Sequence, residues 1–379
     1  MPTPSLLIVP ARFKSGKMYS QIPTSGAGDF TVTRATVATR VNASGLIESV
    51  ASGIPRLDYF ASGGTVGCPA LLVEPSGSNL ALHSRDLTNA VWSGTNVTTA
   101  KNAVGADGVA SGATTITATA ASGTVLQAIS HASQSRIFSA YVRRVTGTGA
   151  IQMTTNSGTN WTTVTISSLY TQVACTAQTV ASGTVGFRMA VSGDVIEVDF
   201  TQGEVGPVAT SVIPTTTAAV TRNADVITVS GAVSGSIGQT EGTIYAEVDL
   251  RNFTAGKNIL STDDGSTSNR VSLFVDPSPN RLTAVISSGG TGTFVSGSIT
   301  TGVHKIAVSY SSGDVQVFLN GGFLASGIPT LFPSVTRNNL SIGGRILSGV
   351  YGASLNDRIR AAALYTTRLT NAQLAALTT

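Results

Sequence analysis

The chain has 379 residues, of which 41% are hydrophobic and only 11% are charged, with a formal net charge of +4 at pH 7. This length exceeds the roughly 250 to 300 residues that one core supports, so it predicts two or three domains. The lysines and arginines are scattered without a dense basic run, and no apolar stretch reaches the ~20 residues of a membrane span. These features argue against nucleic-acid binding and membrane insertion.

The first region, residues 1–84, is the part of the chain richest in proline. Its prolines are Pro2, Pro4, Pro10, Pro23, Pro55, Pro69 and Pro75. Because proline has no N–H to donate to a strand ladder, this density is too high for regular sheet. We expect an extended, loosely structured segment that needs partners to become ordered.

Charged residues of this region offer a way to order it. The arginines are Arg34, Arg40 and Arg56, and the acidic residues that accompany them are Glu48, Asp58 and Glu74. The planar guanidinium group matches a carboxylate in geometry. We therefore interpret these residues as polar pairs that order the segment, with a ligand site as the alternative.

The second region, residues 85–222, consists of short alternating runs separated by Gly and Ser. In residues 137–144 the side chains of Phe138, Ala140 and Val142 share one face, as expected for a strand. Similar runs follow at 161–166, 185–191 and 195–200. Ser, Thr, Gly and Asn replace charge across the chain and suit strands and tight turns. The pattern is typical of a β-sandwich.

The third region, residues 223–379, alternates more cleanly. Residues 243–250 place Ile244 and Val248 on an inward face, and Tyr245, Glu247 and Asp249 on a solvent-facing side. Further strands are expected at 271–275, 282–286, 305–310, 314–319 and 340–342. Residues 320–322, Asn-Gly-Gly, favour a hairpin turn, since Asn and Gly tolerate positive φ. A short helix is expected at 371–377, after the N-cap Thr370.

A sugar-binding platform needs an aromatic ring with amides nearby, and Asn160, Trp161 and Tyr170 offer these groups. They are the candidate glycan-binding residues. The alternative for Trp161 is a core residue at the start of a strand.

Two pairs of acidic residues have the alternate spacing that places carboxyl groups on one face of a strand, Glu197 with Asp199 and Glu247 with Asp249. A glycosidase needs two carboxyl groups that converge on a cleft. Acidic residues that alternate on a strand also form an ordinary solvated face, and we assign no catalytic residue.

Oxygen ligands for calcium are offered by Asp263, Asp264 and Gly265, with Asn269 and Asp276 beyond them. Asp-Asp-Gly is also a turn sequence, and the spacing matches no EF-hand. Cys68 and Cys175 lie far apart with no CxxC partner, so neither a disulfide framework nor zinc is expected. We predict no metal and no cofactor.

Ordered motifs in the first 92 residues resemble an N-terminal module of phage virion proteins of the head-fibre and tail-fibre type. The motifs are FTVTR at 30–34, ATRVN at 38–42, GLIE at 45–48, PRLDY at 55–59, LLVEP at 71–75 and SRDLTNAVW at 84–92. The resemblance implies an attachment module that anchors the protein to a virion.

The later regions resemble two kinds of jelly roll. ATSVIPT at 209–215 is similar to the end of a carbohydrate-binding-module-like domain. VFLNG at 317–321 and LTNAQL at 369–374 are similar to concanavalin-A-like or laminin-G-like sandwiches. We therefore predict an all-β chain: an extended virion-attachment module (1–84), a carbohydrate-binding-module-like jelly roll (85–222), and a β-sandwich with a short C-terminal helix (223–379).

These resemblances imply a virion structural protein without enzymatic activity, a capsid head fibre or decoration protein that displays two sandwiches outward. The expected partners are other copies of the chain, in a trimer, and major capsid or tail proteins of the same virion. Residues 1–18 lack the apolar core of a signal peptide, so we expect assembly in the cytoplasm of the bacterial host. The alternatives are a tail fibre or adhesin that binds host surface glycans, and a polysaccharide depolymerase.

Overall fold

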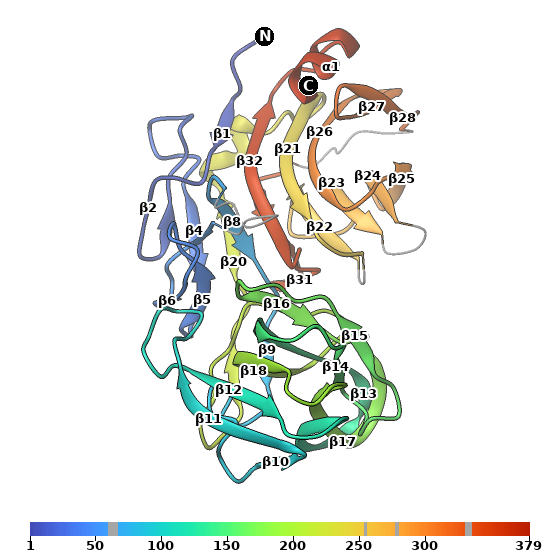
Figure 1. Ribbon diagram of the computed structural model, residues 1–379. Coiled ribbons are helices and arrows are strands. Elements are labelled where there is room, and N and C mark those ends of the chain that lie inside the picture. Colours follow the sequence, from blue (N-terminus) through green and yellow to red (C-terminus); the bar gives the residue numbers. More distant parts are fainter. Residues whose placement is uncertain (60–66, 254–255, 277–279, 330–335) are drawn as a thin grey trace.

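The computed structural model describes residues 1–59, 67–253, 256–276, 280–329 and 336–379. Antiparallel strands dominate these ranges, and Figure 1 shows them as an upper and a lower body. The predicted all-β class with sandwiches is confirmed. Across the described ranges, no helix is long and apolar enough to cross a bilayer.

Two sheets form the upper sandwich. The β21 sheet follows the order β28 (Gly322–Gly327), β27 (Asp314–Leu319), β26 (Gly302–Ser311), β21 (Gly242–Leu250), β32 (Asp357–Tyr365), β8 (Ala70–Val73) and β7 (Arg56–Asp58), with β1 (Leu6–Ile8) also on β32. The β23 sheet follows the order β2 (Phe13–Lys14), β3 (Lys17–Met18), β4 (Phe30–Thr33), β20 (Val226–Ser230), β29 (Asn339–Ile342), β22 (Lys257–Asp263), β23 (Arg270–Asp276), β24 (Arg281–Ser288) and β25 (Thr291–Ser298).

The lower sandwich is built from one large sheet that folds around its own core. Its main path is β11 (Val97–Ala103), β12 (Ala113–Ala118), β18 (Val195–Val205), β13 (Gly123–Thr146), β17 (Gln178–Met189), β14 (Ile151–Thr154) and β15 (Thr162–Val164). The strands that join beside this path are β9 (Gly77–Asn79), β10 (Trp92–Thr95), β16 (Thr171–Ala174) and β19 (Val220–Arg222). Its core includes Trp92, Phe138 and Phe187, whose rings pack at tilted or edge-on angles.

The remaining elements are short. They are the hairpins β5 (Ala38–Val41) with β6 (Ile47–Val50) and β30 (Arg345–Leu347) with β31 (Val350–Gly352), the 3-10 helix η1 (Ala232–Ser236), and the helix α1 (Asn371–Thr378). Thr370 caps α1 in a capping box with Gln373, which confirms the predicted helix and its N-cap. Asn320 and Gly321 both have positive φ between β27 and β28, so the predicted hairpin turn is confirmed as well.

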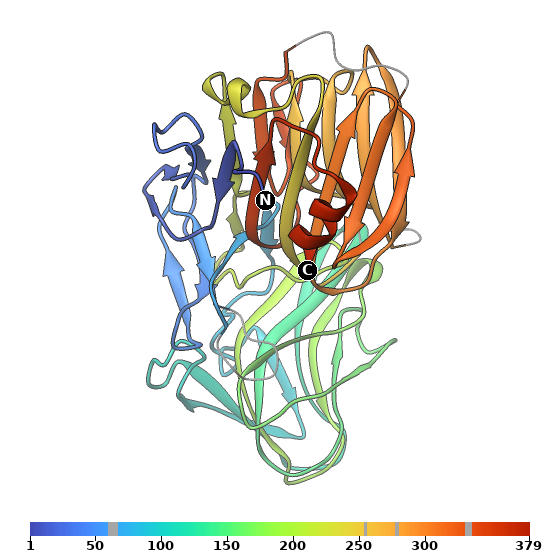
Figure 2. The same ribbon diagram turned by 90° about the horizontal axis from the view of Figure 1, so that it is seen from above.

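The N-terminal region is built into the upper sandwich. Leu6 lies opposite Leu364, and β4 and β8 pair with β20 and β32. Leu6, Phe30 and Leu71 are buried in the same core as Ile244. In Figure 2 the blue N-terminal strands run beside the yellow and red strands of that sandwich. The prediction that proline keeps this region out of regular sheet is wrong, because it supplies strands β1 to β9, and the partners that order it lie in its own chain.

In strand β21, the prediction of which side chains face solvent is only partly correct. Ile244, Ala246 and Val248 point into the core as predicted. The prediction that Tyr245 faces solvent is wrong, because α1 packs over this end of the sheet and buries Tyr245 with Leu374 in a small second core. Alternation predicts which residues share a face, but not whether another element covers that face.

Candidate functional site

A buried ionic network joins the three regions of the chain. Arg56 lies at its centre, with Nη1 at 2.8 Å from Oε2 of Glu74 and a second ion pair to Asp225. Arg34 Nη1 lies 2.8 Å from Oδ1 of Asp225, and Arg222 Nη2 lies 3.3 Å from Glu74. These side chains are almost fully buried. Burial alone would raise the pKa of Glu74, but Arg56 and Arg222 hold it well below its ordinary value.

The other predicted ordering residues lie around this network. Arg40 Nη2 is 2.5 Å from Oε1 of Glu48, and Asp58 Oδ2 is 2.5 Å from Arg358 Nη2. The partners Arg222, Asp225 and Arg358 were not anticipated as members of the network, because they follow Arg56 by more than 160 residues and share no local spacing with it. The network is internal to the fold: its ion pairs join buried groups of one chain, and Arg34 and Arg56 also donate to backbone carbonyls.

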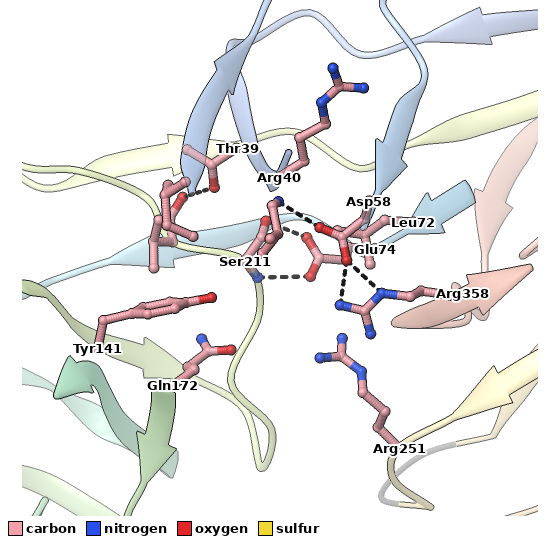
Figure 3. Close-up of a pocket in the computed structure, with 13 residues that line it drawn as sticks. Thr39, Arg40, Asp58, Leu72, Glu74, Tyr141, Gln172, Ser211, Arg251 and Arg358 are labelled. Carbon is pink, nitrogen blue, oxygen red and sulfur yellow. Dashed lines mark hydrogen bonds and ion pairs between the residues drawn. The ribbon is translucent and has the colours of Figure 1, made fainter. Parts of the chain in front are cut away.

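A small cavity lies beside the network, and Figure 3 shows side chains from all three regions around it. Tyr141 and Gln172 reach it from the lower sandwich, and Asp58, Arg251 and Arg358 from the upper one. Its volume is about 20 Å³. Such a space fits about one water molecule and is too small for a sugar ring.

Glu204 lies close to the network and is completely buried. Its carboxylate accepts hydrogen bonds from the Thr210 backbone N at 2.9 Å and from the Thr210 hydroxyl at 2.6 Å. Burial, assisted by the negative charge of Glu74, outweighs these bonds and raises the pKa of Glu204 to about 7. It is therefore a carboxyl group that titrates near neutral pH.

Trp161 is half-buried and is not a member of the lower core. The Arg188 guanidinium lies 4.5 Å from the centroid of its ring, and Asn160 Nδ2 lies 3.4 Å from Oε1 of Gln178. Tyr170 has different neighbours: Arg143 lies 4.7 Å over its ring, and its hydroxyl donates to the Val104 carbonyl at 3.0 Å. The structure therefore gives Trp161 and Tyr170 separate surroundings rather than one shared platform.

Three of the four candidate acidic residues lie close to an arginine. Glu197 lies 2.5 Å from Arg143, and Asp199 is buried and lies 2.8 Å from Arg85. Burial raises the pKa of Asp199, against the opposing effect of Arg85. Glu247 lies 3.9 Å from Arg360.

The Asp263 and Asp264 carboxylates accept hydrogen bonds from the turn that follows them. Asp263 Oδ1 accepts from Gly265 N at 2.9 Å, and Asp264 Oδ1 accepts from Ser266 N at 3.0 Å. Asn269 Nδ2 donates to Asp264 at 2.8 Å. Among the residues that the structure describes, no three acidic, His or Cys side chains gather into a metal-binding group.

A groove of about 610 Å³ lies at the edge of the upper sandwich, a volume typical of small-ligand sites. Strands β23, β24 and β25 supply its floor, and β28 adds Ala325 and Ser326. Phe274 and Phe294 both line it. No motif in the sequence points to this surface, although Phe294 is an aromatic residue at an outward position in a strand of small residues.

Phe294 lies against the sheet as a flat aromatic surface. Its side chain is 63% exposed, whereas the next residue, Val295, is buried in the core. A Cβ built on Gly292 would lie 3.0 Å from Cε2 of Phe294, so the edge of the ring lies beside this glycine. A larger residue at 292 would lift the ring from the strand, and glycine therefore keeps the platform flat.

Cross-strand pairing sets the polar groups of the groove in rows. Phe274 lies opposite Thr283, which lies opposite Ser296. In the adjacent row on the same face, Asp276 lies opposite Arg281, whose Nη2 donates to Asp276 Oδ2 at 2.8 Å. The groove thus combines the exposed Phe294 ring, the partly buried Phe274 ring, the Ser296 hydroxyl and one ion pair.

Comparison with known proteins gives fold similarity alone. No family model and no curated protein match the chain. Among solved structures, it is distantly similar to the CBM40 domain of Ruminococcus gnavus IT-sialidase (TM-score 0.35, 16% identity, covering 39% of this chain and 88% of that one). It is also similar to leech intramolecular trans-sialidase (0.35, 14%, 39% and 24%) and to the binding domain of botulinum neurotoxin DC in complex with SialylT (0.33, 10%, 41% and 39%).

Proposed function

We propose that the chain is a glycan-binding protein of the adhesin type, and that the groove beside β25 is its binding surface. The observation that carries this proposal is the flat, 63% exposed Phe294 ring in a groove of about 610 Å³. A pyranose ring presents an apolar C–H face and polar hydroxyl edges. The aromatic ring suits the first, and Ser296 and the Asp276–Arg281 pair suit the second.

The experiment compares binding of the whole chain and two variants to a glycan array. Phe294→Ala removes the platform, and Phe323→Ala is the matched control, since Phe323 is 58% exposed and packs edge-on to Phe318 outside the groove. We expect Phe294→Ala to weaken binding by roughly tenfold and Phe323→Ala to leave it unchanged. Equal binding by wild type and Phe294→Ala, or no glycan binding by the wild type, would refute the proposal.

We propose further that this protein acts on a phage particle as a capsid head fibre or decoration protein, without catalysis. The support is the resemblance of the motifs between residues 30 and 92 to phage virion modules. In the structure, the motif residues Arg34, Arg56 and Glu74 belong to the buried network. Attachment to the virion would therefore use the outer surface of a folded body rather than a free N-terminal tail. Electron microscopy of virions carrying a labelled copy tests this location, and label found only on host cells would refute it.

Weak binding at a single groove is compatible with an adhesin if several copies act together. A trimer on a particle would raise the effective affinity without any new contact in the groove. Sedimentation of the full chain measures this directly, and a stable monomer at all concentrations would exclude the avidity argument.

A further inference from the structure

The groove carries opposite charges that neutralise each other. Asp276 and Arg281 lie opposite one another on β23 and β24, with side chains 26% and 43% exposed. They are the only charged residues among the described residues that line the groove. An anionic sugar drawn to Arg281 would also meet the Asp276 carboxylate, so the ion pair gives little net attraction for negative charge.

The same ion pair suits hydroxyl groups. A guanidinium group has five N–H donors, and an ionised carboxylate is an acceptor only. Two neighbouring sugar hydroxyls can bind this pair at the same time, one accepting a hydrogen bond from Arg281 and the other donating one to Asp276. A neutral sugar makes these bonds without bringing an unpaired charge into the groove.

The rows of the groove are spaced for a short oligosaccharide. Phe294 lies opposite Val285, Ser296 opposite Thr283, and Ser298 opposite Arg281. These positions are two residues apart along β25, so successive rows lie roughly 7 Å apart. The aromatic platform and the ion pair are then separated by about 14 Å along the strand, with Thr283 and Ser296 between them.

We propose that the groove binds an uncharged hexopyranose oligosaccharide that lies along β25. One sugar stacks its apolar face on Phe294, and vicinal hydroxyls of a further sugar bridge Asp276 and Arg281. This specificity rests on the glycan-binding function proposed above. It adds that Asp276 excludes acidic sugars from the groove.

The test uses the full chain and an array of paired glycans that differ only by a terminal sialic acid. We expect the wild type to prefer the neutral member of each pair, with little change in binding when salt is raised. Asp276→Asn should weaken binding to neutral glycans by roughly tenfold and reduce the preference against sialylated ones. Arg281→Gln should weaken neutral binding without increasing sialylated binding.

Asp314→Asn is the matched control, because Asp314 forms a comparably exposed ion pair with Arg368 away from the groove. Wild-type binding to sialylated glycans alone, lost in Arg281→Gln and weakened by salt, would overturn the neutral specificity and leave glycan binding in place. An unchanged preference in Asp276→Asn would also overturn it. By contrast, full binding by Phe294→Ala would refute the groove as the glycan site altogether.

Discussion

Replacement of Glu204 by Gln should remove a pH dependence from the stability of the fold. The pKa of Glu204 is raised from 4.5 to about 7, chiefly by burial. At a pH between these two pKa values, Glu204 keeps its proton in the folded chain and releases it in the unfolded chain. The free energy of unfolding therefore falls as pH rises through this window, and the stabilising contribution is fully present only below about pH 4.5.

The magnitude follows from the size of the shift. A shift from 4.5 to about 7 corresponds to about 3 kcal/mol, since one pKa unit is about 1.4 kcal/mol. Gln is neutral at every pH and keeps an oxygen that accepts from Thr210. We expect Glu204→Gln to match the wild type near pH 4.5 and to be more stable by up to about 3 kcal/mol at pH 8.

The assay is urea unfolding of both proteins from pH 4.5 to pH 8, followed by the fluorescence of Trp92 and Trp161 in the lower sandwich. The difference between the two proteins isolates Glu204 from other titrating groups. A difference that stays constant over this range would refute the reasoning. Glu74→Gln is the contrasting variant. Because the pKa of Glu74 is lowered by its arginine partners, removal of its negative charge should destabilise the fold at pH 8.

Two further predictions concern stability. Arg56→Met should lower the free energy of unfolding by about 3 to 5 kcal/mol, because Glu74 and Asp225 stay buried with less positive charge beside them. Arg40→Met, which removes one side of a partly exposed ion pair, should cost less than about 1 kcal/mol. Equal losses for the two variants in urea unfolding would contradict this assignment. Thr370→Ala should cost about 1 kcal/mol through loss of the α1 cap, seen as a lower melting temperature, and an unchanged melting temperature would show that the cap is dispensable.

The fold class was predictable from local patterns. Alternation places Ile244, Ala246 and Val248 in the core, positive φ at Asn320 and Gly321 makes the hairpin, and Thr370 caps the helix. Each signal depends on residues only a few positions apart, and such signals are read directly from a sequence.

Long-range pairing was not predictable in this way. Strand β1 has three residues, and the pairing of Leu6 with Leu364 has no local signature. The groove was missed for a related reason. Phe294 becomes a platform only because glycine at 292 leaves room beside its ring and because residues of β24 and β28 line the same groove. Trp161 and Tyr170 offer the aromatic rings that a sugar platform needs, but the fold places each ring beside its own arginine.

The pairing of the first strand with the last has a consequence for synthesis of the chain. Strand β9 enters the lower sandwich and β19 leaves it, and the two strands pair with each other. The lower sandwich is thus an insertion whose ends emerge side by side, and it can fold while the ribosome is still making the rest. Strands β1, β4 and β8 must wait for β20 and β32, so the earliest segment made is among the last to become ordered.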